Sequence, residues 1–483
     1  PPSSSLLRLP SLVFPPSSSL PPPRSRRLSS VADGAFAQCD LQPDGCGQCL
    51  RARLRCHGYR NTLDLVFRDE TRSTEQKVMA RQAWSLASPP SALELGWDIR
   101  ARYAFFSIYV FGFSRSLAAV VPFYNRAPFI GHLAASVEAT SLAFFATYLN
   151  KPDLMLLANR SYVIAIQCLS RSLNGLESNG LEEALQSILL LDTYEKIVDR
   201  NPRCSSSWMS HAKGGVSLLE SNGSQVIVSL ASRQLSARLV SALIVGCGAA
   251  AVRVPDTLTR LQIRLDPFDC SVKWKFMGIL ASIVDLQADL HNAAGHYGTD
   301  HAKRAWQLDL QLTSLHLGLP PSWRPRHLSP VGDDPLIFGS YYDEFTDHYV
   351  AQISNGINAM HLVLSRIMSS HSPSNASSSN INDITRQICA AVPHLILPGA
   401  QQSNTIPFSP RQRLQCCTLL APLYLTSQVS GDALMKTWIL RCLNYMSEIG
   451  GLKIAQDVAN VMRNNPDLDY WSIIAMVGSY AFA

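Results

Sequence analysis

Four of the chain's twelve cysteines lie close together near its N-terminal end. They are Cys39, Cys46, Cys49 and Cys56, and their spacing is C-x6-C-x2-C-x6-C. Thiolates at these intervals can converge on one tetrahedral metal ion, because C-x2-C lets two sulfurs bind from a single tight turn. In a reducing compartment this pattern favours zinc over disulfides. The alternative is four ordinary reduced cysteines.

Basic residues surround the last two of these cysteines. Residues 50–55, LRARLR, predict a short helix that carries three cations. The net charge of the whole chain is only +6 over 483 residues, so any affinity for nucleic acid must come from a local patch. The candidate DNA-contacting residues are therefore Arg51, Arg53, Arg55 and Arg60.

Residues 39–60, CDLQPDGCGQCLRARLRCHGYR, resemble the last two thirds of a fungal Zn2Cys6 binuclear zinc cluster. The four cysteines match the third to sixth cysteines of that family's motif. The resemblance implies a nuclear, zinc-dependent regulator of RNA polymerase II transcription and not an enzyme. It implies zinc as the cofactor, and promoter DNA and the transcription machinery or co-regulators as partners, with a homodimer as an option.

The first two cysteines of the family motif are absent, since no cysteine precedes Cys39. In the family the first and fourth cysteines bridge two zinc ions, so this chain retains one bridge, Cys46, and should hold at most one zinc. The helix that reads base edges in the family is also missing. Either a wrongly predicted first exon has removed the start of the cluster, or the finger is degenerate and the regulator acts through protein partners.

The amino-acid composition of the N-terminal region changes along the chain and indicates three segments. Residues 1–38 are rich in Pro and Ser, contain arginines and have no acid before Asp33, so we expect this segment to be disordered. Such a composition also resembles a mitochondrial presequence, but the prolines interrupt the amphipathic helix that import requires. We expect residues 39–60 to form the partial cluster and residues 61–98 a linker with a short helix near 73–84.

From residue 99 onward, helical patterns alternate with polar or Pro/Gly breaks. Almost nothing alternates with period two, so we expect an all-α fold with a large helical regulatory domain over residues 99–470. No apolar run is long and uncharged enough to predict a membrane span. The expected helices are 102–121, 132–149, 154–173, 181–198, 208–219, 232–252, 272–291, 342–368, 384–391, 409–425 and 434–462.

These helical patterns also resemble the regulatory domain of the same family. The resemblance rests on several short segments in a fixed order. They include Tyr162, Tyr194-Glu195, Trp208 with His211 and Gly214-Gly215, Leu319-Pro320 with Trp323, and the closing segments around Leu420–Tyr424, Trp438 and Gly451. The chain departs from the family at residues 354–358, SNGIN, where the family tends to have W-N-x2-R.

One further motif suggests a different class of protein, a nucleotide-cofactor enzyme. Gly246-Cys-Gly248-Ala-Ala-Ala251 fits the dinucleotide fingerprint G-x-G-x-x-A, and Asp266 would be the residue for the ribose. The alternative is a stretch of small residues in the second half of the helix expected at 232–252. Because no strand–helix–strand alternation surrounds the motif, the sequence favours the helix.

The densest group of histidines lies in the segment HNAAGHYGTDH. It contains His291, His296, Asp300 and His301. Metal binding on one helix face requires ligands four residues apart on a continuous helix, and glycines interrupt this segment. We therefore predict an exposed loop and not a metal site.

Overall fold

A computed structural model describes residues 47–51, 53, 95–114, 117–118, 120–125, 131–173, 180–200, 206–222, 229–293, 299–330, 332–369 and 375–481. The chain divides into two compact units, Pro1–Glu94 and Leu95–Ala483. In the first unit the description covers helix α1 (Gly47–Arg51) and Arg53. Our expectations for residues 1–38 and for the helix near 73–84 lie outside the described residues.

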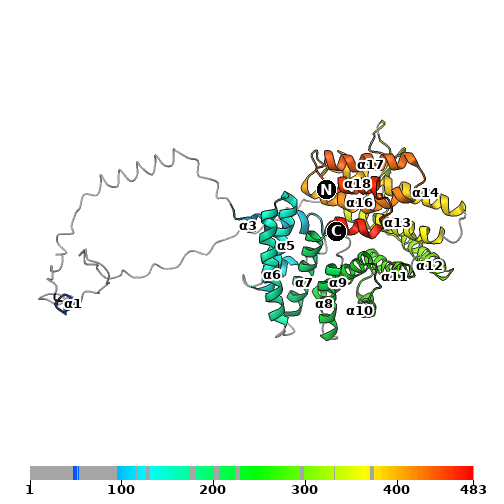
Figure 1. Ribbon diagram of the computed structural model, residues 1–483. Coiled ribbons are helices and arrows are strands. Elements are labelled where there is room, and N and C mark those ends of the chain that lie inside the picture. Colours follow the sequence, from blue (N-terminus) through cyan, green and yellow to red (C-terminus); the bar gives the residue numbers. More distant parts are fainter. Residues whose placement is uncertain are drawn as a thin grey trace, which may run out of the picture. The chain divides into compact units, whose positions relative to one another are not determined.

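The second unit is built almost entirely from helices, which confirms the all-α fold class (Figure 1). Its first half contains α3 (Trp97–Ala104), the π-helical segment η2 (Phe105–Val110), α4 (Val120–Tyr124), α5 (His132–Leu149), α6 (Pro152–Leu173), α7 (Leu181–Val198), α8 (Ser206–Ser221), α9 (Leu230–Ala249) and α10 (Asp256–Leu265). Its second half contains α11 (Val272–Asn292), α12 (Thr299–Leu317), α13 (His348–Ser369), α14 (Asn375–Ala390), α15 (Pro393–Ile396), α16 (Pro410–Val429), α17 (Ala433–Glu448), α18 (Lys453–Asn464) and α19 (Tyr470–Val477).

Helix α5 packs against both α6 and α7, and the three run side by side in Figure 1. Its sequence, HLAASVEATSLAFFATYL, has small or apolar residues on more than one face, so it can be buried on two sides. Thr140 donates its hydroxyl to the carbonyl of Leu190 at 3.0 Å, which links α5 to α7. Asn150 ends α5 in the left-handed conformation, with φ at 52°, and the chain turns into α6.

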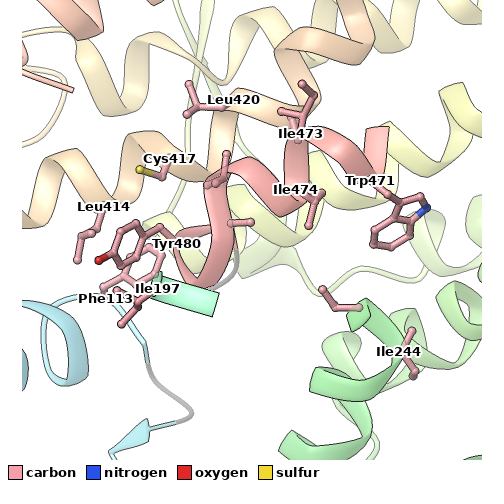
Figure 2. Packing of buried hydrophobic residues seen from close by; sticks show 14 of the residues in the cluster. Phe113, Ile197, Ile244, Leu414, Cys417, Leu420, Trp471, Ile473, Ile474 and Tyr480 are labelled. Atoms are coloured by element: carbon pink, nitrogen blue, oxygen red, sulfur yellow. The ribbon is translucent and has the colours of Figure 1, made fainter. Parts of the chain in front are cut away.

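The C-terminal helices are part of the large hydrophobic core. Figure 2 shows Ile473 and Ile474 of α19 between Leu420 of α16 and the helix that carries Ile244, which is α9. The indole of Trp471 donates to Gln287 Oε1 of α11 at 2.9 Å. The core therefore continues past residue 470, where we expected the helical domain to end.

The expected helix 102–121 and the expected helix 434–462 are each interrupted. After η2 the chain turns at Phe111–Phe113, and the next α-helix that the structure describes is α4. The second pattern splits into α17 and α18, because Gly451 takes a left-handed conformation with φ at 67°. Continuous apolar periodicity concealed both breaks.

Four of the described helices and one hairpin were not expected. Helices α10, α15 and α19 are short, and α12 is largely polar. The expected helix 342–368 begins only at His348, because Tyr342–Glu344 forms strand β2, antiparallel to β1 (Arg326–Leu328). Within the described ranges, no helix is both long and apolar enough to cross a membrane.

Candidate functional site

The structure describes only part of the predicted zinc and DNA segment. Cys49 lies in α1, and Arg51 and Arg53 are exposed. The helix expected at 50–55 instead begins at Gly47 and ends at Arg51, and Arg53 follows in a turn with φ at 52°. The other predicted site residues lie outside the described residues: Cys39, Cys46, Cys56, Arg55 and Arg60.

The predicted histidine loop is partly helical. His291 is exposed near the end of α11, and Asp300 and His301 lie in the first turn of α12, whereas His296 lies outside the described residues. Among the residues that the structure describes, no group of three or more His, Cys, Asp or Glu side chains is placed to hold a metal ion.

The glycines of the dinucleotide-like motif serve helix packing. Gly246 and Gly248 lie near the C-terminal end of α9, whereas a phosphate-binding loop must lie where a helix begins. A Cβ atom on Gly248 would lie 2.6 Å from three carbons of the Trp471 indole, so only glycine allows this approach. Asp266 accepts the indole N–H of Trp274 at 2.7 Å, which gives it a structural role. The motif thus lacks the geometry of a cofactor site.

Three of the family-like residues contact one another across three helices. The hydroxyl of Tyr162 on α6 donates to Glu195 on α7 and lies 2.9 Å from His211 Nε2 on α8. Burial, together with the hydrogen bond to Glu195, raises the pKa of Tyr162. Burial also acts to raise the pKa of Glu195, but hydrogen bonds from His211 and Tyr162 outweigh it and lower that pKa. The cluster joins α6, α7 and α8.

The second unit contains a cavity of about 510 Å³. Its wall combines aromatic and aliphatic side chains with charged ones, contributed mainly by α7, α8, α9 and α11 and by η9 (Gly478–Tyr480). The polar and aromatic side chains that give the wall its chemistry include Asp192, Lys196, Trp208, Arg238, Asp269, Lys273, Trp274, Tyr349 and Ser479.

Asp192 and Lys196 form a buried ion pair on the cavity wall. Lys196 Nζ lies 2.8 Å from Asp192 Oδ2. Lys196 is 8% exposed to solvent and Asp192 is 4% exposed. The ammonium also lies 5.7 Å from the centre of the Trp208 ring. The second carboxylate oxygen, Asp192 Oδ1, is buried and has no hydrogen-bond partner among the described residues, and the same holds for Ser479 Oγ.

Two further cations line the same cavity, Arg238 on α9 and Lys273 on α11. The pKa of Lys273 is lowered to about 8, mainly by burial and also by the charge of Arg238, whereas the charge of Asp269 acts to raise it. Burial also lowers the pKa of Arg238. Lys273 Nζ lies 5.4 Å from the centre of the Tyr349 ring. The cavity wall therefore carries the basic side chains of Lys196, Arg238 and Lys273 beside the carboxylates of Asp192 and Asp269.

Sequence reasoning missed this cavity. Asp192 is a carboxylate within the apolar run ILLLDTYEKIV, which is an unusual place for a charged side chain. The usable signal was Asp192 followed four residues later by Lys196, because that spacing places opposite charges on one buried helix face.

No protein-family model, curated protein or solved structure matches this chain.

Proposed function

We propose that the protein is a zinc-dependent, DNA-binding regulator of RNA polymerase II transcription of the fungal type, acting in the nucleus. The observation that carries this proposal is the cysteine spacing C-x6-C-x2-C-x6-C with arginines beside its last two cysteines. In this reading residues 1–38 are a Pro/Ser-rich segment, residues 39–60 a partial zinc cluster and residues 99–470 the helical regulatory domain. Its partners would be promoter DNA and the transcription machinery or co-regulators.

Two features of the second unit support the proposal. The unit is built almost entirely from helices, as the resemblance requires. Tyr162, Glu195 and His211 are far apart in the sequence but contact one another. A physical linkage of this kind would explain why these residue types occur together in one pattern.

The expected mechanism follows from what the segment retains. One zinc ion bound by Cys39, Cys46, Cys49 and Cys56 would hold a compact turn, because four thiolates complete a tetrahedral shell. The exposed Arg51 and Arg53 would contact phosphates, together with Arg55 and Arg60. Since the base-reading helix is absent, DNA binding should be weak and insensitive to sequence.

A second candidate function is a regulator whose finger is degenerate and which acts only through protein partners. The missing first two cysteines favour this reading. Both candidates can be tested on the same protein, by counting bound zinc and by measuring how DNA binding depends on salt.

We expect native mass spectrometry of a peptide spanning residues 36–62 to show one zinc at most. Two zinc ions per peptide would contradict the inferred ligand set, and none would favour the degenerate finger. In the full chain, four phosphate contacts imply a log–log salt slope of roughly −3 to −4, at about −0.9 per contact.

Changing Arg51, Arg53 and Arg55 to Ala should reduce that slope by about one unit for each arginine that no longer neutralises a phosphate. Arg160→Ala is the matched control, because Arg160 is exposed on α6 and outside the finger. Fluorescence anisotropy with specific and scrambled duplexes measures both slope and preference. An upstream C-x2-C-x6 segment with basic residues should restore specificity when fused to the chain. High specificity without that segment, or none with it, would contradict the proposal.

A further inference from the structure

Helix α6 (Pro152–Leu173) presents an apolar stripe to solvent. Its buried residues recur on one face, and α6 packs mainly against α5 (Figure 1). Away from that face, Leu156, Val163 and Ile164 are 61%, 51% and 53% exposed. Leu157 is also exposed, and it precedes Ile164 by seven residues, which is the interval between the other two. Side chains seven residues apart lie two turns along the same helix face, so the four form one stripe of the kind that a partner covers.

Two charged side chains flank this stripe at the ends of α6. Asp153 lies in the first turn and Arg171 in the last turn, and both are exposed. Neither side chain makes a hydrogen bond or an ion pair with another residue that the structure describes. The two residues are eighteen positions apart, which is five turns at 3.6 residues per turn. At about 100° per residue, both project between the directions of Val163 and Ile164, so they lie on the side of the helix that carries the stripe.

We propose that α6 is the contact surface between two copies of this chain, which pair antiparallel about a two-fold axis at the level of Tyr162. Asp153 and Arg171 each lie nine residues from this point, so the axis places Asp153 of each copy opposite Arg171 of the other. The same axis brings Val163 and Ile164 of the two copies together at the centre. This surface goes beyond the proposed function, because it involves neither the cysteine segment nor DNA.

The pattern of charge favours a second copy as the partner, and an antiparallel pair over a parallel one. A two-fold contact requires one surface that complements itself, and α6 carries an apolar centre with opposite charges at equal distances on either side. In a parallel pair Asp153 would face Asp153 and Arg171 would face Arg171, so like charges would repel. Each copy contributes one helix that is about 33 Å long, so we expect a weak dimer that dissociates on dilution.

Sedimentation velocity of the full chain between about 1 and 100 µM measures this self-association. We expect monomers at the low end of that range and dimers at the high end. Ile164→Glu should raise the dissociation constant about tenfold or more, because it places two charges in the apolar centre of the contact. Ile263→Glu is the matched control, because Ile263 is 63% exposed on α10 and the same charge is introduced away from α6. A chain that stays monomeric throughout, or an equal effect of the two variants, would overturn the proposal.

An exchange of charges tests the antiparallel register. Asp153→Arg and Arg171→Asp should each weaken self-association, because each variant alone would place like charges opposite one another. An equimolar mixture of the two variants should form dimers about as well as the unmodified chain, because every cation then faces a carboxylate of the other variant.

Each variant has the same change in its own helix whether it is alone or mixed, so a folding defect does not produce this recovery. Native mass spectrometry identifies the mixed dimers by their mass. No weakening in either variant alone, or no recovery in the mixture, would contradict the antiparallel pair and overturn the proposal.

Discussion

Removing one partner of the buried pair Asp192–Lys196 should destabilise the second unit more than removing both. The two charges lie 2.8 Å apart and are nearly inaccessible to solvent. Lys196→Met leaves a buried carboxylate whose Oδ1 already has no partner among the described residues. Breaking a buried pair in this way costs about 3–5 kcal/mol of the free energy of unfolding.

This cost converts into a measurable change in the melting temperature. The unit Leu95–Ala483 has roughly 390 residues, and the entropy of unfolding is about 2.1 cal/mol/K per residue, or about 0.8 kcal/mol/K in total. Lys196→Met should therefore lower the melting temperature by about 4–6 °C. The double variant Asp192→Leu/Lys196→Met should recover most of this decrease, because two apolar side chains need no partner.

The assay is a double-mutant cycle by thermal and urea denaturation of the full chain, followed by circular dichroism. Asp98–Arg102 is the matched control, since it has the same i, i+4 spacing and a 2.9 Å contact but is far more exposed. The coupling energy of the control pair should be below about 0.5 kcal/mol. Equal coupling energies for the two pairs, or a destabilisation below about 1 kcal/mol for Lys196→Met, would refute the reasoning.

Two further predictions concern single residues. Gly248→Ala should destabilise the chain by about 1–3 kcal/mol, because its Cβ would overlap the Trp471 indole. Gly214→Ala should stabilise the chain by about 0.5–1 kcal/mol, because no atom lies near the added Cβ and alanine favours the helix. Urea denaturation of both variants measures the contrast. The lowered pKa of Lys273, about 8, means that the unfolded chain binds more protons between pH 8 and 10.5, so stability rises with pH over that interval. Lys273→Met should therefore be more stable than the unmodified chain at pH 7, and the difference should shrink by about pH 10.5; a difference that is constant in pH would contradict the burial of this ammonium.

Local sequence patterns were sufficient to predict where long helices such as α5 and α7 lie. The expected bounds of α5 and α7 agree with the structure at both ends. Each has a glycine directly before its first residue and a long, largely apolar run after it, so periodicity and boundary signals agree. The patterns did not predict helix ends where apolar periodicity continued past the end of a helix, as at Gly451 between α17 and α18.

The two candidate sites differ in how far apart their residues lie in the sequence. The cysteine and arginine set of residues 39–60 could be proposed from the sequence, because ligand spacing along one short segment limits the geometry. The cavity could not be proposed in this way, since Asp192, Arg238, Lys273 and Ser479 belong to four separate elements.

The amino-acid sequence by itself determined the helical class of the chain, the position of its longest helices and a candidate zinc segment. All of these depend on residues a few positions apart, whose geometry the backbone repeat sets. Only the tertiary structure decided that Gly246 and Gly248 serve packing against α8 and α19, and that buried charges from distant helices line one cavity. Those outcomes depend on how the helices pack, because packing determines which side chains are shielded from water and which face one another.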